Sequence, residues 1–241
     1  MELTRLARIA LAEFIGTMFL VAIVVGSGIA AQRLSPDDAG LQLLENALAT
    51  GGGLVAIILA VGAVSGAHLN PVVSLAERFF GGLTNRELGI YIGAQVTGGI
   101  AGCVLANLMF DLDAVTWSTK ERSGSGLWLA EVVATVGLLL VIFGLARSRR
   151  SHLAPFAVGA YIASAYFFTS STSFANPAVA IGRMFSDTFA GIDPSSAPAF
   201  IGFELVGAVV GIALIAVLYP TIRAHVDDVV VPHPPAPKVR D

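Results

Sequence analysis

The chain has 241 residues, of which 55% are hydrophobic and only 13% are charged, and its formal net charge is −3. A soluble domain has roughly 25% charged residues, so too little polar sequence is left to cover a water-soluble fold. The small negative charge gives no reason to expect nucleic acid as a partner, and the single cysteine, Cys103, excludes a disulfide framework. We therefore expect an all-α integral membrane protein whose partner is the lipid bilayer.

Six long runs of residues carry almost no charge and predict six transmembrane helices. They are residues 10–31, 46–64, 88–110, 127–146, 153–168 and 199–219. A membrane helix needs about 20 mainly apolar residues, and most of the runs reach that length. The fifth run is short and is assigned mainly by its repeat partner. The first run is long and lacks a small-residue cleavage pattern, so it predicts a helix and not a removed signal peptide.

The second half of the chain repeats the first. The matching pairs are AEFIGTMFLVAIVVG at 12–26 with AEVVATVGLLLVIFG at 130–144, SGAHLNPVVSLAERF at 65–79 with STSFANPAVAIGRMF at 171–185, and IGAQVTGGIAG at 92–102 with IGFELVGAVVG at 201–211. The repeats cover about 8–110 and about 127–220, with three spanning runs in each. An odd number of spans per repeat inserts the second copy from the opposite face, as in many transport proteins.

An Asn-Pro pair lies between the second and third span of each half, as Asn70-Pro71 and Asn176-Pro177. Asn is a favoured N-cap and Pro suits the first helical position, so each pair predicts a helix start. The helices that follow have about nine residues, or roughly 13 Å, which is half of the ~30 Å hydrocarbon core. We expect two re-entrant half-helices that meet near the midplane.

The two half-helices would present their N-termini to each other. Each N-terminus carries about half a positive charge, which repels protons and cations, while the amides of Asn70 and Asn176 can donate to a passing solute. Pore diameter, lining donors and half-helix dipoles are known sources of channel selectivity. This arrangement favours a small, neutral, hydroxylated solute.

The acids inside the membrane are Glu13, Glu131 and Glu204. Glu13 and Glu131 occupy matching places in the two halves, and we expect them to brace the loops before Asn70 and Asn176 by accepting backbone N–H groups. Gln95 and Glu204, also a matched pair, are expected to brace as well. The alternative is a proton-coupled secondary carrier that uses Glu13 or Glu131.

The four histidines are scattered and none has a partner at metal-ligand spacing. They are His68, His152, His225 and His233. We therefore expect no metal site, no cofactor and no enzymatic activity. His68 is expected to line or brace the inner vestibule.

Lysine and arginine near the helix ends predict the orientation, because cytoplasmic loops carry an excess of them. With the N-terminus inside, ten lie on inner segments and four on outer ones: Arg5, Arg8, Arg78, Arg86, Arg147, Arg149, Arg150, Arg223, Lys238 and Arg240 against Arg33, Lys120, Arg122 and Arg183. Both termini are therefore predicted to be cytoplasmic. We expect one channel domain over residues 1–222 and a Pro-rich, disordered cytoplasmic tail over residues 223–241.

The motifs SGAHLNPV and NPA, at matching places in a six-helix inverted repeat, resemble those of the aquaporin, or major intrinsic protein, family. The resemblance covers about residue 8 to 222. The resemblance implies a right-handed bundle of six helices and two half-helices, one pore per subunit, a homotetramer, and passive conduction of water or small neutral solutes without a cofactor. The implied pore centre is Asn70, Pro71, Val72, Asn176, Pro177 and Ala178. Val72 departs from the usual Ala and adds bulk beside the central constriction.

The selectivity filter that the resemblance implies departs further from the family. Three residues after the second Asn, where the family nearly always has Arg, this chain has Val179. Thr50 stands where water channels usually have Phe, and Ser173 lies three residues before Asn176. For the position on the fifth helix, counting from Asn176 leads to Ser164 and counting from Ala154-Pro155 leads to Tyr166; we prefer Tyr166, because a count within a helix is safer than one through a loop.

Loss of the filter Arg removes a charge and widens the opening, so a water-only pore is not expected. The pairing of Thr50 with Val179 looks like a bacterial subgroup associated with metalloid permeation, such as arsenite, which would place the protein in the inner membrane of a bacterium. Arg183 lies one helical turn after Val179 and can lean back over it. It either replaces the missing charge or pairs with Asp187 or with lipid headgroups.

Overall fold

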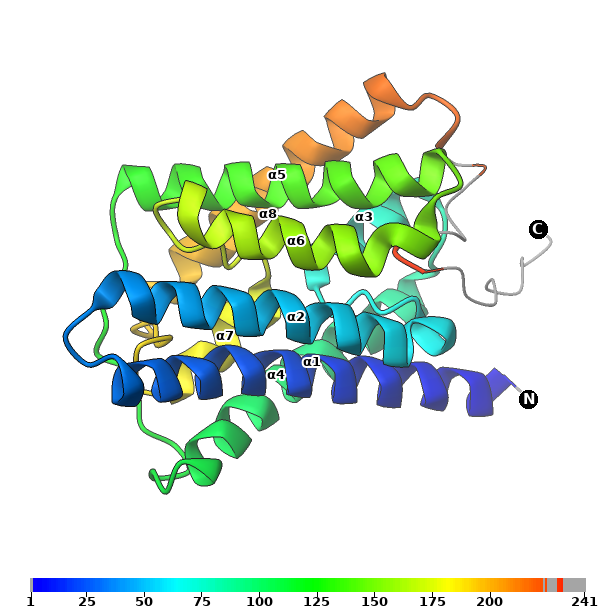
Figure 1. The fold of residues 1–241 in the computed structure, drawn as a ribbon. Helices are drawn as coiled ribbons and strands as arrows, with labels where there is room; N and C mark the ends of the chain where they lie inside the picture. Colours follow the sequence, from blue (N-terminus) through cyan, green and yellow to red (C-terminus); the bar gives the residue numbers. More distant parts are fainter. Residues whose placement is uncertain (1, 223, 225–228, 232–241) are drawn as a thin grey trace.

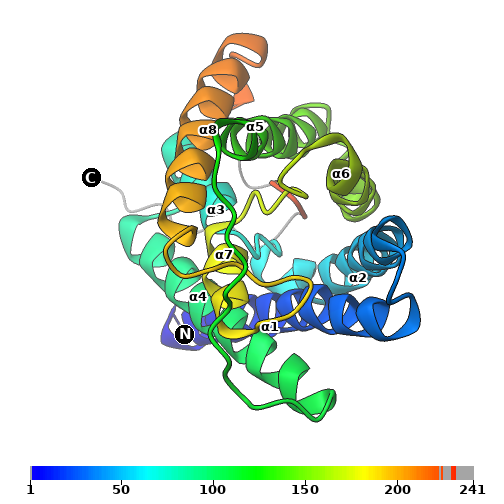
Figure 2. The ribbon, with the colours of Figure 1, turned by 90° about the vertical axis from the view of Figure 1, so that its left-hand side faces the viewer.

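The computed structural model describes residues 2–222, 224 and 229–231. Its helices are α1 (Glu2–Leu34), α2 (Ala39–Ser65), α3 (Pro71–Phe80), α4 (Asn85–Met109), α5 (Ser125–Arg147), α6 (Ala154–Phe168), α7 (Pro177–Gly182) and α8 (Ala197–Leu218), with short 3-10 turns η1 (Ser151–Leu153) and η2 (Arg183–Phe185). Figure 1 shows the long helices running roughly side by side, and Figure 2, along the bundle, shows α3 and α7 enclosed by the others.

Five helices of the described chain are long and apolar enough to cross a membrane: α1, α2, α4, α5 and α8. The sixth, α6, has only 15 residues, in line with its short apolar run. Its N-terminal side is extended by η1, and Pro155 lies in its first turn, where a missing N–H does no harm. The all-α fold with six long helices and two half-helices agrees with the fold predicted from the repeat.

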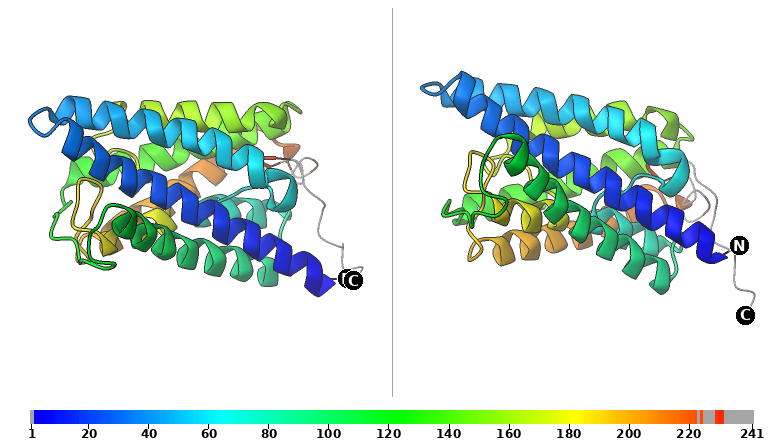
Figure 3. Two further views of the ribbon diagram at one scale, coloured as in Figure 1. Left: turned by 60° about the horizontal axis from the view of Figure 1, so that its bottom comes forward. Right: turned by 90° about the horizontal axis from the view of Figure 1, so that it is seen from below.

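The two repeats pack in the same way, with α1 against α4 in the first half and α5 against α8 in the second. Glycines allow this close approach. A Cβ on Gly102 would overlap the carbonyl of Met18 in α1, and one on Gly207 would lie 2.9 Å from the carbonyl oxygen of Val132 in α5. Figure 3 shows α4 lying alongside α1.

The half-helices begin at their Asn-Pro pairs, as predicted. Asn70 and Asn176 are N-caps in extended conformation, followed by Pro71 and Pro177 at the first helical position. In Figure 1, α3 lies toward the end of the bundle where α1 begins and α7 lies toward the opposite end. The second half-helix is shorter than the nine residues expected, because α7 ends at Gly182 and the chain tightens into η2.

The tail differs from the sequence prediction. We expected all of residues 223–241 to be disordered, but Val229 and Val230 are 0% and 2% exposed and belong to the main hydrophobic core. The prediction was wrong for this part, because the three valines at 229–231 can bury apolar surface although the tail as a whole is rich in proline. The rest of the predicted tail, apart from Ala224, lies outside the described residues.

Candidate solute pore

The loops that precede the two half-helices have matching, unusual backbones. Ala67 and Leu69 in the first loop, and Ser173 and Ala175 in the second, have φ between 47° and 52°. This left-handed region is uncommon for residues other than glycine. When residues with left-handed and right-handed backbone conformations alternate, successive N–H groups point toward one side of the chain. These N–H groups then form a concave site for an anion.

A buried carboxylate occupies each of these concave sites. Glu13 accepts the N–H groups of His68 at 3.0 Å and Leu69 at 2.8 Å. Glu131 accepts those of Phe174 at 3.0 Å and Ala175 at 2.7 Å. These are the contacts expected of bracing residues, and the donating loop residues of the two halves are related by the same offset as Asn70 and Asn176.

Gln95 and Glu204, the second matched pair of buried polar residues, support the loops in different ways. Gln95 donates to Glu13 Oε2 at 2.8 Å, and Ser65 donates to Glu13 Oε1 at 2.6 Å, so the Glu13 carboxylate accepts four hydrogen bonds in all. Glu204 instead accepts the backbone N–H of Asn176 at 3.0 Å. Gln95 therefore supports a loop through another side chain, whereas Glu204 supports one directly.

The two asparagines lock the half-helices together at the centre. Asn70 Nδ2 donates to the carbonyl of Ala175 at 2.7 Å, and Asn176 Nδ2 donates to the carbonyl of Leu69 at 2.8 Å. Each Oδ1 caps its own half-helix by accepting an N–H, that of Val72 or Ala178, at 3.0 Å. Since an amide nitrogen carries two hydrogens, each asparagine retains one donor for a solute.

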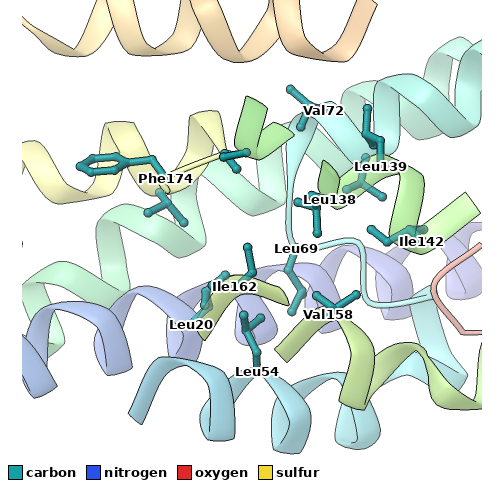
Figure 4. Packing of buried hydrophobic residues seen from close by; sticks show 14 of the residues in the cluster. Leu20, Leu54, Leu69, Val72, Leu138, Leu139, Ile142, Val158, Ile162 and Phe174 are labelled. Atoms are coloured by element: carbon teal, nitrogen blue, oxygen red, sulfur yellow. The ribbon is translucent and has the colours of Figure 1, made fainter. Parts of the chain in front are cut away.

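A cavity inside the bundle extends past these asparagines. The volume of the cavity is about 50 Å³, which is enough for a few water molecules. Its lining residues are Leu20, Val24, Thr50, Leu54, Ile58, Ala67, His68, Leu69, Asn70, Val73, Leu138, Ile142, Val158, Ile162, Tyr166, Ser173, Phe174, Asn176, Val179, Arg183 and Val230. Figure 4 shows several of its apolar members converging from different helices.

Of the six residues assigned to the pore centre, only Asn70 and Asn176 line this cavity. Pro71, Val72, Pro177 and Ala178 are buried behind them. Val72 is fully buried among core residues. The expectation that it adds bulk beside the constriction was therefore wrong, because its side chain points into helix packing.

The expected filter residues Thr50, Tyr166, Ser173 and Val179 all line the cavity. Thr50 Oγ1 and Tyr166 Oη are 3.1 Å apart, within hydrogen-bonding distance. Ser164, the alternative to Tyr166, is exposed on the outer face of α6 and donates to the carbonyl of Ala160. The count within the helix thus led to the residue that faces the cavity.

Arg183 also lines the cavity and is 2% exposed. Its guanidinium carbon lies 3.5 Å from the centre of the Phe174 ring, and its Nε donates to the carbonyl of Ala190. Within the described part of the chain its two terminal nitrogens make no hydrogen bond. Asp187 instead accepts hydrogen bonds from Thr119, so the expected alternative of an Arg183–Asp187 pair is not found.

Two residues near the Arg183 guanidinium, Phe174 and Arg122, were not predicted from the sequence. Phe174 lines the cavity and holds Arg183, and the guanidinium of Arg122 lies 5.2 Å from the same ring. Phe174 could have been suspected from its place two residues before Asn176. Arg122 could not, because it comes from a loop without periodicity.

His68 lines the cavity on the side of α3. Its ring pairs with the buried Glu77 through Nε2, at 2.5 Å, and lies 3.0 Å from Ser74 Oγ through Nδ1. Both partners belong to α3, so His68 ties the first loop to its half-helix. Among the described residues no group of three or more His, Cys, Asp and Glu side chains could hold a metal ion.

Comparison with known proteins agrees with this architecture. The family model for major intrinsic proteins matches residues 1–175. The chain is 50% identical over 218 residues to aquaglyceroporin AqpS of Rhizobium meliloti (strain 1021), covering 90% of this chain and 93% of that one. It is 30% identical over 165 residues to a probable glycerol uptake facilitator protein of Thermotoga maritima, covering 62% and 69%.

A solved structure has the same fold. The aquaglyceroporin from Plasmodium falciparum superposes with a TM-score of 0.69 over 91% of this chain and 99% of that one. The sequence identity is 20%, so the likeness concerns the arrangement of helices alone. It agrees with the helical fold described above.

Proposed function

The chain belongs to the major intrinsic protein family, whose members are membrane channels and not enzymes, and we propose that it is a passive channel for water and small uncharged solutes. The proposed cargo includes polyols and neutral metalloid hydroxides such as arsenous acid. The proposed setting is the inner membrane of a bacterium, with both termini in the cytoplasm and four subunits in a homotetramer.

The observation that carries this proposal is the composition of the cavity wall. The hydroxyl groups of Thr50 and Tyr166 and the amides of Asn70 and Asn176 line the cavity, while most other lining side chains are aliphatic. A neutral polyhydroxylated solute can replace its water hydrogen bonds along the polar residues and lay its carbon or arsenic side against the apolar ones. An ion would lose its hydration without compensation.

The filter proposed here is amphipathic and wider than that of a water channel, with Thr50, Tyr166, Ser173 and Val179 around it. We assign the missing positive charge to Arg183, one turn beyond Val179. Its buried guanidinium lies against Phe174 and keeps two terminal nitrogens for a solute or for repulsion of cations. The names of the two sequence relatives, an aquaglyceroporin and a glycerol facilitator, support polyols as cargo.

The other candidate, a proton-coupled carrier that uses Glu13 or Glu131, finds less support. Both carboxylates accept two backbone N–H groups from the loops, so a protonation cycle would break loop contacts at every turnover. The four hydrogen bonds that Glu13 accepts favour a structural role in holding the loop.

Stopped-flow measurements on proteoliposomes distinguish the two candidates. We expect shrinkage and re-swelling with glycerol, smaller and larger polyols and arsenous acid to proceed at the same rate with and without a proton gradient. Collapse of solute flux when the gradient is dissipated would favour the carrier. Flux of water with exclusion of every solute would contradict the widened filter.

A further inference from the structure

The C-terminal segment of this chain reaches back into the pore. Val230 is the only described residue beyond α8 that lines the cavity, together with residues from α2, α5 and α6. In Figure 2 the short red segment lies inside the ring of helices, between α2, α5 and α6. In Figure 1 it lies at the end of the bundle where α1 begins, whereas α7 lies toward the opposite end.

The side chains of Val229–Val231 pack closely against apolar residues. Val229 and Val230 are 0% and 2% exposed, and Val231 packs against the same core. A Cβ on Gly62, near the end of α2, would lie 2.7 Å from a methyl carbon of Val231 and 2.9 Å from its Cβ. The absence of a side chain at Gly62 therefore makes room for Val231.

Val230 has a backbone conformation that valine avoids. Its φ is 55°, in the left-handed region that is a genuine outlier for a β-branched residue. Such a conformation persists only where its surroundings impose it, and strain of this kind is concentrated at functional sites and switches. A strained segment is held in the mouth by packing and gains backbone freedom when it leaves.

We propose that Val229–Val231 is an autoinhibitory plug that closes this end of the pore. The side chain of Val230 lies in the cavity wall beside aliphatic residues such as Ile142 and Val158. It offers water no hydrogen-bond partner, and apolar constrictions of this kind close channels by excluding water. The open channel then requires withdrawal of the segment from the site beside Gly62. This inference rests on the proposed channel function.

Two truncations of the full chain test the plug with a matched control. A chain that ends at residue 222 lacks the valines, and a chain that ends at residue 231 keeps them. We expect the osmotic water permeability of proteoliposomes to rise several-fold for the shorter chain and to stay at the full-length value for the longer one. Equal permeability of all three chains, or an equal rise in both truncated chains, would overturn the plug.

A reversible cross-link tests the position of the segment independently of flux. In the double variant Gly62→Cys with Val231→Cys, a Cβ at residue 62 would lie 2.9 Å from the Cβ of residue 231, so a small outward shift of the terminal segment brings the pair into the 3.5–4.5 Å range of a disulfide. Cys103 is fully buried. We expect oxidation to form an intramolecular disulfide in the double variant and to lower permeability, and reduction to restore it, whereas neither single variant should respond to oxidation or reduction. Reduced Gly62→Cys should conduct more than the wild type, because its side chain takes the space that Val231 occupies. A disulfide that leaves flux unchanged would refute closure, and failure to form one would refute the contact.

The outcomes separate the plug from the channel function. If the chain that ends at residue 222 conducts water and glycerol no better than the full chain, and both conduct well, the plug fails and the channel stands. If neither the full chain nor the truncated one conducts any solute, the proposed function fails and the plug fails with it.

Discussion

The guanidinium of Arg183 lies over the ring of Phe174, with 3.5 Å between its central carbon and the ring centroid. Both residues line the cavity. Phe174 comes from the loop before the second half-helix and Arg183 from the turn after it. The contact therefore spans the half-helix and holds the guanidinium beside the residues proposed as the filter. A cation held on an aromatic face in a desolvated site gains about 2 kcal/mol.

Replacement of Arg183 with Gln should open the pore to cations. Two unit charges 4 Å apart repel by about 4 kcal/mol at an effective dielectric constant near 20, so we expect sodium conductance in planar bilayers to rise by at least about tenfold. Arg149→Gln, which changes an exposed arginine at the opposite end of the bundle, is the control. Unchanged cation exclusion in Arg183→Gln would show that the half-helix dipoles suffice.

Val179→Arg should narrow the filter and favour water over larger solutes. The new side chain adds bulk and a second guanidinium near Arg183. An added barrier of about 1.4 kcal/mol slows a rate tenfold, and we expect at least that loss for glycerol in liposome swelling, with a smaller loss for water. Equal loss of both would mean that Val179 does not lie at the selective constriction, and Val179→Met separates added bulk from added charge.

Glu13→Gln should destabilise the protein without altering any proton dependence. The carboxylate accepts four hydrogen bonds, and a carboxamide turns an NH₂ group toward donors that need an acceptor. A buried group left unsatisfied costs about 1–3 kcal/mol, so the thermal unfolding temperature in detergent should fall clearly, whereas that of the exposed Glu121→Gln should not. Normal stability combined with loss of gradient-driven uptake would instead identify a carrier.

Lys120 in the outer loop should make stability depend on pH in the alkaline range. Partial burial and the nearby charges of Arg122 and Arg183 lower the pKa of Lys120 from 10.5 to about 8. Between these two values the unfolded chain holds a proton that the folded chain has released, so the free energy of unfolding should rise with pH from about 8 to 10.5. We expect unfolding temperatures between pH 7 and 10 to show this slope in the wild type and in Lys238→Met, and to lack it in Lys120→Met.

Much of the fold could be predicted because it follows from local and periodic properties of the chain. Length and hydropathy define the long helices, and the matching segments around Glu13 and Glu131 define the inverted repeat. Asn70-Pro71 and Asn176-Pro177 carry a cap and a fixed φ in adjacent residues, so the start of each half-helix needs no tertiary information. The end of the second half-helix was harder, because the tightening after Gly182 depends on what packs around η2.

A residue that lines the cavity could be predicted from the sequence where its position along a helix decides which way its side chain points. Tyr166 faces the cavity and Ser164 does not, as the count along α6 indicated. Val72 was misplaced in the lining because the family pattern names the residue after Pro71 and does not say where its side chain points. In this bundle that side chain fills a gap between helices.

The sequence alone determined that the chain spans the membrane as an inverted repeat with two capped half-helices and that an apolar residue, Val179, stands at the position proposed for the filter. Only the tertiary structure decided that Arg183 settles on Phe174 and that Val229–Val231 enters the mouth beside Gly62. Helix starts and apolar runs depend on neighbours within one or two turns of the chain. The place of a loop arginine or a tail valine depends on which surfaces distant helices leave open, and those exist only once the bundle has packed.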